Sequence, residues 1–168
     1  MTLWNDLLRT SETGWVILVR LLVGLVVFFP EGLQKLLFPE ILGAGRFAKI
    51  GIPYADLMGP FVGVVETICG LLIIVGLFTR LATIPLIAVM VFAVLSTKVP
   101  ILLGHDVGPF HLGADIKRVG FAAQHEARAD LTIFLGLLFL LVVGSGRWLL
   151  DAVMSRRARG LAPIRSLR

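Results

Sequence analysis

Residues Leu57–Phe78 read LMGPFVGVVETICGLLIIVGLF, an apolar run that is long enough to cross a lipid bilayer as one helix. Glu66 is the only charged residue of this run and stands near its middle. A charged side chain at that depth costs roughly 2.5–3.5 kcal/mol on insertion scales, so such residues are usually paired, protonated or functional. The run therefore predicts a membrane-spanning helix whose carboxylate has a structural or chemical task.

The rest of the chain is equally apolar. Of its 168 residues, 57% are hydrophobic and 16% are charged, whereas a soluble domain has about 45–50% apolar and about 25% charged residues. The excess is grouped into runs that we interpret as four spans: Trp15–Leu37, Leu57–Phe78, Leu81–Lys98 and Leu131–Trp148. Together they predict an all-α, four-helix transmembrane bundle that occupies residues 1–168 as a single domain.

Charges outside the spans predict the orientation of this bundle. With four spans, both termini lie on one side, together with Arg80 and a basic tail, residues 149–168. Positively charged segments remain in the cytoplasm, so we place both termini there and the long 99–130 loop outside. The tail predicts contact with anionic membrane lipids. No aromatic residues interleave with its arginines, which disfavours a nucleic-acid partner.

Two helix faces carry an unusual polar pattern. Residues three or four apart share a face, and the first span has Arg20, Gly24, Phe28, Glu31 and Lys35 on one such stripe. The second span has Gly59, Gly63, Glu66 and Gly70, and small residues at this spacing permit close helix approach. We expect the two stripes to pack together and to bring Arg20 toward Glu66. That pair would either lock the bundle or contact a ligand or proton in a cavity.

The smaller polar features allow less specific interpretations. Glu31 and Lys35 are interpreted as an ordinary surface pair, and Glu40–Ile50 as a short interfacial helix. Cys69 has no second cysteine to pair with, and we interpret it as a small buried residue. No motif for haem, flavin, an iron–sulfur cluster or a metal is recognisable, since the three histidines have no metal-ligand spacing.

The loop before the last span contains a compact polar segment. It reads QHEARAD, residues 124–130, and combines a histidine, carboxylates and an arginine. Such a segment is suited to a polar headgroup, an anion or a proton-accepting ligand. It is equally suited to a solvated helix start, where acidic residues favour the N-terminal end of the helix dipole.

Three motifs in order along the chain resemble the DoxX family. They are the first-span pattern from Arg20 to Lys35, the run from Glu66 through Gly76-Leu-Phe-Thr-Arg80, and the ending Gly144-Ser-Gly-Arg-Trp-Leu-Leu-Asp151. The ending departs from the family pattern at Leu149, where a serine is usual. Lys98 to His105, with the 125–130 segment, is similar to a longer-loop branch of the family. The resemblance covers nearly the whole chain.

The resemblance implies a multi-pass protein of the bacterial cytoplasmic (inner) membrane with a long periplasmic loop between helices 3 and 4. It also implies a subunit of a quinone-linked oxidoreductase system that works with a redox partner protein or a second copy of itself. In that role, Arg20 would polarise a quinone oxygen and Glu66 would carry the proton. The ligand-binding candidates around them are Lys35, Lys98, His105, His125, Glu126, Arg128 and Asp130.

Two other functions stay open at this stage. One is a non-catalytic assembly or scaffold subunit for a redox or stress-related partner, and the other is a conduit for small solutes or protons. The sequence leaves open whether the chain is itself catalytic.

Overall fold

The computed structural model describes residues 14–112, 121–144 and 146, and this part of the chain is built from helices. The first rod consists of α2 (Val16–Val26), the π-helical segment η1 (Val27–Leu33) and α3 (Gln34–Leu37). A short helix, α4 (Ala44–Lys49), leads to α5 (Ala55–Val75). The next rod consists of α6 (Thr79–Ala93), the π-helical segment η2 (Val94–Lys98) and α7 (Val99–Leu103), and α8 (Phe121–Val143) follows.

Three of these rods have the length and composition of membrane spans: Val16–Leu37, Ala55–Val75 and Thr79–Leu103. They coincide with the first three predicted spans to within a few residues at most ends. The third rod continues past its predicted end at Lys98. Pro100 does not end it, because it lies at the start of α7, where the missing N–H of a proline breaks no helical hydrogen bond. The short helix predicted within Glu40–Ile50 is present as α4.

The fourth predicted segment differs most from the structure. Helix α8 begins at Phe121, well before the apolar run that starts at Leu131, so its first turns are polar. The loop predicted over 99–130 is therefore too long at both ends, because residues 99–103 belong to α7 and residues 121–130 belong to α8. Residues 145 and 147–168, which include most of the closing motif and the basic tail, lie outside the described residues.

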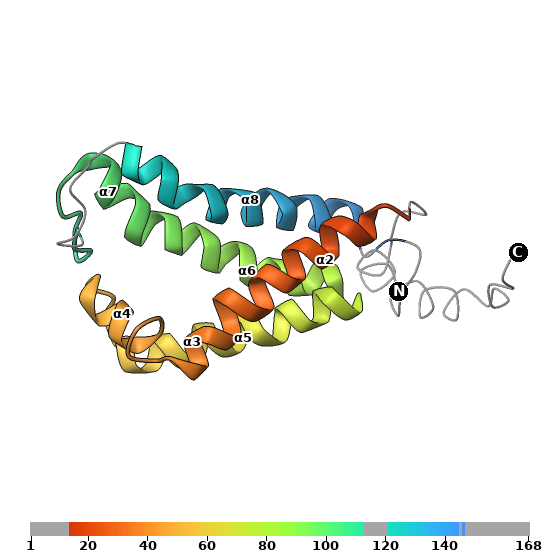
Figure 1. Cartoon of the computed structure of the whole chain (residues 1–168), viewed down its shortest axis with the longest axis horizontal. Coiled ribbons are helices and arrows are strands. Elements are labelled where there is room, and N and C mark those ends of the chain that lie inside the picture. Colours follow the sequence, from red (N-terminus) through yellow and green to blue (C-terminus); the bar gives the residue numbers. More distant parts are fainter. Residues whose placement is uncertain (1–13, 113–120, 145, 147–168) are drawn as a thin grey trace, which may run out of the picture.

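The helices form two pairs that converge at one end of the molecule. In Figure 1, α2 crosses α5 in one layer, and α6 runs beside α8 in the other. The layers meet near the start of α2 and diverge toward α4 and α7. Buried apolar side chains fill the space between the layers where they are close. They include Val23, Val27, Ile73, Leu86, Leu137 and Leu140.

Glycines allow the first rod to lie directly on α5. A Cβ atom added to Gly70 would lie 2.8 Å from the backbone nitrogen of Phe28. One added to Gly32 would lie 2.6 Å from the backbone nitrogen of Thr67. The predicted close approach is therefore confirmed for this pair of helices. Gly59 differs, since its missing side chain leaves room for Ala44 at the start of α4.

Both π-helical segments lie at prolines. Pro30 stands inside η1, and Pro100 follows η2 by two residues. A proline has no backbone N–H to continue the α-helical hydrogen bonding, and a widened turn is one way to accommodate it. In η2, the hydroxyls of Ser96 and Thr97 also donate to the carbonyl oxygen of Ala93. Side-chain bonds of this kind compete with the regular backbone pattern and favour a local distortion.

The start of the connection after α7 is tied down by its own side chains. The Asp106 carboxylate accepts the backbone N–H of Leu112 at 2.7 Å and contacts Nδ1 of His111 at 3.1 Å. These two interactions lower the pKa of Asp106. The backbone N–H of His111 also donates to the carbonyl oxygen of Ile50. This segment is therefore anchored to the end of α4.

The glycine contact predicts a specific weakness. Replacing Gly70 by alanine should destabilise the protein by about 1–3 kcal/mol, because the new methyl group meets the backbone of η1 rather than a mobile side chain. Thermal unfolding followed by circular dichroism in mild detergent measures the effect. Val64→Leu, an exposed position on the same helix, is the matched control and should change little. Equal melting temperatures for the two variants would contradict the close packing.

Candidate functional site

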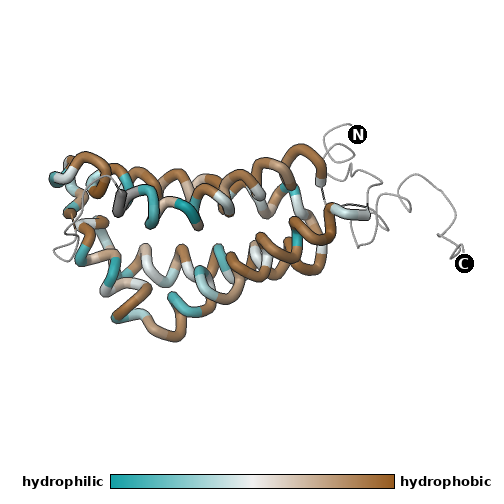
Figure 2. The backbone as a smooth tube through the Cα atoms, turned by 45° about the horizontal axis from the view of Figure 1, so that its top comes forward, coloured by the Kyte–Doolittle hydropathy of each residue, from teal (hydrophilic) through white to brown (hydrophobic). Residues whose placement is uncertain are grey.

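A cavity of about 430 Å³ lies where the two helix pairs diverge. This volume falls within the range of small-molecule sites, roughly 300–1,000 Å³. Much of the wall is apolar and includes Phe47, Met58, Phe61, Met90 and Phe92. Six charged side chains also line it: Glu31, Lys35, Arg46, Glu66, Lys98 and Asp130. Figure 2 shows hydrophilic positions gathered at this wide end, within a bundle that is otherwise mostly hydrophobic.

One wall of the cavity carries three linked charges, which we name the Glu31–Lys35–Glu66 cluster. Lys35 Nζ lies 2.7 Å from Oε1 and 2.6 Å from Oε2 of Glu66. The same ammonium lies 3.2 Å from Oε2 of Glu31. Side-chain exposure falls from 29% at Glu31 to 11% at Lys35 and 0% at Glu66. The cluster thus runs from a partly open position to a fully buried one.

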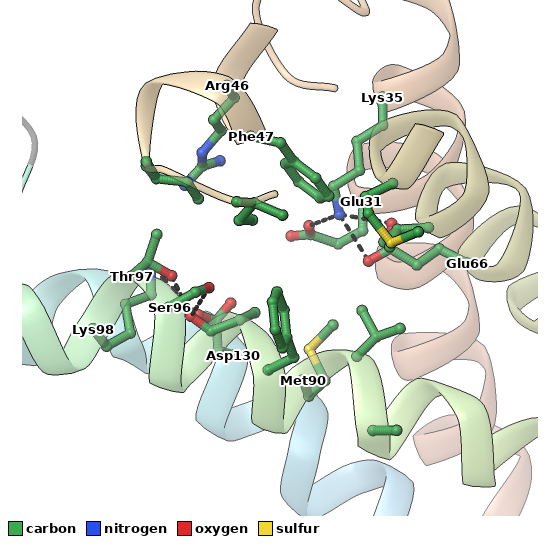
Figure 3. Close-up of a pocket in the computed structure, with 18 of the residues that line it drawn as sticks. Glu31, Lys35, Arg46, Phe47, Glu66, Met90, Ser96, Thr97, Lys98 and Asp130 are labelled. Carbon is green, nitrogen blue, oxygen red and sulfur yellow. Dashed lines mark hydrogen bonds and ion pairs between the residues drawn. The ribbon is translucent and has the colours of Figure 1, made fainter. Parts of the chain in front are cut away.

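Local helix geometry brings these three side chains together. Glu31 and Lys35 are one helical turn apart, on η1 and α3, so they share a face of the first rod. A Cβ atom added to Gly63 would lie 3.4 Å from Cβ of Lys35, so the glycine leaves room for the lysine beside α5. Glu66 is three residues further along α5 and points into the same space. Figure 3 shows the lysine ammonium between the two carboxylates.

The facing wall carries a second ion pair. Lys98, from η2, lies 3.4 Å from the Asp130 carboxylate of α8, and the two side chains are 9% and 15% exposed. This pair joins the third apolar rod to α8 in the wall of the cavity. Arg46 extends from α4 over the space between the two walls (Figure 3). Each of the two walls thus carries paired charges. A single unpaired charge in such an apolar site would be far less stable than a pair.

The predicted contact between Arg20 and Glu66 is wrong. Glu66 pairs with Lys35, and Arg20 is a buried residue outside the cavity lining. Gly24 packs against Ile74, which lies eight residues, or roughly 12 Å, along α5 from Glu66, and Arg20 lies one turn further away on the first rod. The stripe of the first span does face α5, as predicted. The first rod and α5 run antiparallel, however. The end of the stripe that lies beside Glu66 is therefore the end that carries Lys35, and not the end that carries Arg20.

The structure brings together only part of the predicted ligand-binding set. Lys35, Lys98 and Asp130 line the cavity. His125 and Arg128 contact each other on an exposed face of α8, with 2.7 Å between Nδ1 and the guanidinium. His105 is exposed in the connection after α7. The Glu126 side chain lies outside the described part of the chain.

Two charged residues of the site were not predicted from the sequence. Glu31 was interpreted as part of a surface pair, although its place on the stripe with Lys35 was a usable signal. Arg46 belonged to the short helix assigned to the interface, and nothing in the sequence shows that α4 folds over the cavity. Within residues 14–112 and 121–144, no three His, Cys, Asp or Glu side chains converge as a metal site would require.

With this geometry established, comparisons with known proteins identify the family. The DoxX family model matches residues 15–99, which include the first two apolar rods, most of the third and most of the cavity wall. The chain belongs to the DoxX family. An uncharacterized membrane protein of Mycobacterium tuberculosis, Rv3486, is 47% identical to it over 156 residues. That match covers 92% of this chain and 90% of the relative. No solved structure matches the chain significantly.

The paired charges of this DoxX protein predict a stability test. Replacing Lys35 by methionine leaves two carboxylates together in the cavity wall, and losing one partner of a buried pair typically costs about 3–5 kcal/mol. The thermal midpoint in detergent should fall strongly for this variant. The double variant Lys35→Met/Glu66→Gln should recover much of the loss, because it removes the buried carboxylate too. Lys49→Met, an exposed change on α4, is the control.

If Lys35→Met were as stable as Lys49→Met, Lys35 would not be the cation that holds Glu66 in the folded protein.

Proposed function

We propose that this DoxX-family membrane protein binds a quinone in the cavity and serves as the membrane subunit of a quinone-linked oxidoreductase system. The observation that carries the proposal is the Lys35–Glu66 pair in the wall of an otherwise largely apolar cavity. A quinone needs an apolar slot for its ring, a hydrogen-bond donor for its oxygen and a group that exchanges protons. The cavity offers these three features together.

The proposal includes a membrane topology. We place α8 as a fourth span beside the three apolar rods, since its second half is apolar and it packs along α6. Both termini then lie in the cytoplasm of a bacterial cell, and the 104–120 connection lies on the outer side of the inner membrane. In this orientation, the cavity is in the outer half of the bundle, near the connection between α7 and α8.

The aromatic and methionine side chains of the wall suit a flat ring. Phe47, Phe61 and Phe92 come from α4, α5 and α6, so they surround the space from three helices. Aromatic side chains pack against other rings in offset or edge-to-face arrangements, and methionine fills irregular gaps beside them. A polyprenyl tail could leave the cavity toward the lipid, where exposed apolar residues cover the bundle surface.

Arg46 takes over the role that the sequence had suggested for Arg20. Arg20 does not line the cavity, whereas Arg46 extends over it (Figure 3). The Arg46 residue is exposed and is not part of the Glu31–Lys35–Glu66 cluster or of the Lys98–Asp130 pair. A guanidinium presents several N–H donors and keeps its charge at any physiological pH. We place one quinone oxygen near Arg46 at the mouth and the other near the Lys35 ammonium that is bound to Glu66.

The chemistry then divides between this chain and a partner. Reducing a quinone to a quinol takes two electrons and two protons. The partner, a redox protein, supplies the electrons. Glu66 supplies the proton for the inner quinone oxygen through the Lys35 ammonium, because Glu66 has no exposed side-chain surface of its own. The oxygen at the mouth takes its proton from water. This chain therefore binds, orients and protonates the quinone.

Replacing Glu66 by glutamine tests the proton role. The substitution keeps the size of the side chain and leaves Lys35 paired with Glu31, so folding and quinone binding should persist. Quinone reduction by the reconstituted complex should fall by roughly 10²–10⁴-fold, the usual contribution of a positioned proton-transfer group. Glu40→Gln, an exposed change away from the cavity, is the matched control. Full turnover with Glu66→Gln would exclude the proton role of Glu66.

Replacing Arg46 by glutamine tests the placement of the quinone. A lost hydrogen bond from a charged donor is worth about 1.5–3 kcal/mol, so the dissociation constant for a soluble quinone analogue should rise at least tenfold. Titration calorimetry in detergent measures this value directly. Lys49→Gln removes a charge from the same helix outside the cavity and should bind normally. An unchanged affinity with Arg46→Gln would place the quinone oxygen elsewhere.

A scaffold function is the second candidate. The exposed His125–Arg128 pair on the first turns of α8 gives a polar surface beside the outer connection, where a partner protein could dock. On this alternative, Glu66→Gln would lower the yield of the assembled complex and leave its specific activity intact.

A conduit for solutes or protons has less support from the structure. In the described helices, an apolar layer that includes Val27, Ile73, Leu86 and Leu137 lies between the cavity and the level of Arg20. A continuous polar path would need to cross this layer.

A further inference from the structure

We propose that Glu31 is the proton-entry residue of the cavity and that Lys35 relays protons between Glu31 and Glu66. The inference deepens the proposed function, because it states how protons reach the group that serves the quinone. It also describes proton exchange in the protein without any quinone. The two proposals can therefore be tested separately.

The solvent exposure of the two glutamate side chains indicates the direction of the relay. Glu66 has no exposed side-chain surface, so it cannot exchange protons with water directly. Glu31 is 29% exposed and lies at the open end of the same cluster. Lys35 contacts both carboxylates, at 3.2 Å on the Glu31 side and 2.6 Å on the Glu66 side. A continuous chain of hydrogen bonds thus joins the buried carboxylate to a partly open one.

The charge balance of the cluster favours one bound proton. Two carboxylates share a single ammonium, which leaves one excess negative charge when all three groups are ionised. The other charged groups of the cavity lie on separate elements: Arg46 on α4, Lys98 on η2 and Asp130 on α8. Lys98 is already paired with Asp130, and Arg46 reaches over the mouth. A proton on either glutamate removes the excess charge inside the cluster.

The transfer conserves the total charge of the cluster and moves the negative charge from Glu66 to Glu31. In the starting state, Glu31 is a neutral acid, Lys35 is an ammonium and Glu66 is a carboxylate. Lys35 gives one of its protons to the adjacent Glu66 oxygen and receives the proton of Glu31 in return. Afterwards Glu31 is a carboxylate, Lys35 is again an ammonium and Glu66 is a neutral acid. Glu31 then takes a new proton from water at the mouth.

Lysine suits this task better than arginine would. A lysine ammonium can lose a proton when it is buried, whereas a guanidinium keeps its protons under all conditions that leave proteins folded. Lys35→Arg therefore preserves the positive charge and the hydrogen bonds to both carboxylates but prevents the relay. A purely structural ion pair would be maintained in this variant.

The test uses the purified full chain in lipid nanodiscs, without quinone. The probe is the infrared C=O band of protonated Glu66, which is identified by its loss in Glu66→Gln. After a rapid drop to a pH at which the band reaches its full height in every variant, the rate at which the band appears reports proton arrival at Glu66. We expect Glu31→Gln and Lys35→Arg each to slow that rate by roughly 10²-fold or more. Glu31→Asp, which keeps an ionisable group, should recover part of the rate.

Glu40→Gln, an exposed carboxylate outside the cavity, should give the normal rate. Thermal midpoints of all variants, measured in the same nanodiscs, show that slow exchange is not loss of the fold. A normal rate in either Glu31→Gln or Lys35→Arg would overturn the relay. Slow exchange in both, together with an absence of quinone binding in the unmodified protein, would keep the relay and reject the quinone function.

Discussion

A carboxylate inside an apolar helix needs a positive partner, and the arrangement of this protein follows from how Glu66 obtains one. Its partner is on the first rod, which can reach it only because glycines let the two helices approach at backbone distance. The glycine contacts and the ion pair are therefore a single constraint. The glycines set the register of the rods, and the register brings Lys35 beside Glu66. Without the close approach, the ammonium would not be bound by both oxygens.

The cavity depends on the same constraint together with two distortions. The segments η1 and η2 contribute Glu31 and Lys98 to opposite walls, and each contains or precedes a proline. Widened helical turns occur often at functional sites, because they place side chains at angles that a regular helix does not allow. The two pairs of helices are well packed at one end, and their divergence at the other leaves room between the charged walls.

Much of the fold could be predicted from hydropathy alone, because an apolar run of span length has few alternative structures. The glycine stripe also predicted the correct helix pair, and the family resemblance agrees with the comparison. The arrangement of the site was harder to predict from the sequence. Helical periodicity shows which residues share a face but not how far one helix slides along another, so Arg20 was paired with Glu66 in place of Lys35. Arg46 was missed because the fold of a short connecting helix over a cavity is set by tertiary contacts, such as that between Ala44 and Gly59.

The apolar layer between the cavity and the buried Arg20 makes the two membrane faces inequivalent. Under the proposed topology, the site shares protons with the outer compartment and is insulated from the cytoplasm. Reducing a quinone there would draw a proton from outside, and oxidising a quinol would return one to that side. The direction of electron flow would then decide whether the reaction consumes or builds the proton-motive force. A packing feature of four helices would thus link the redox state of the membrane pool to cellular energy storage.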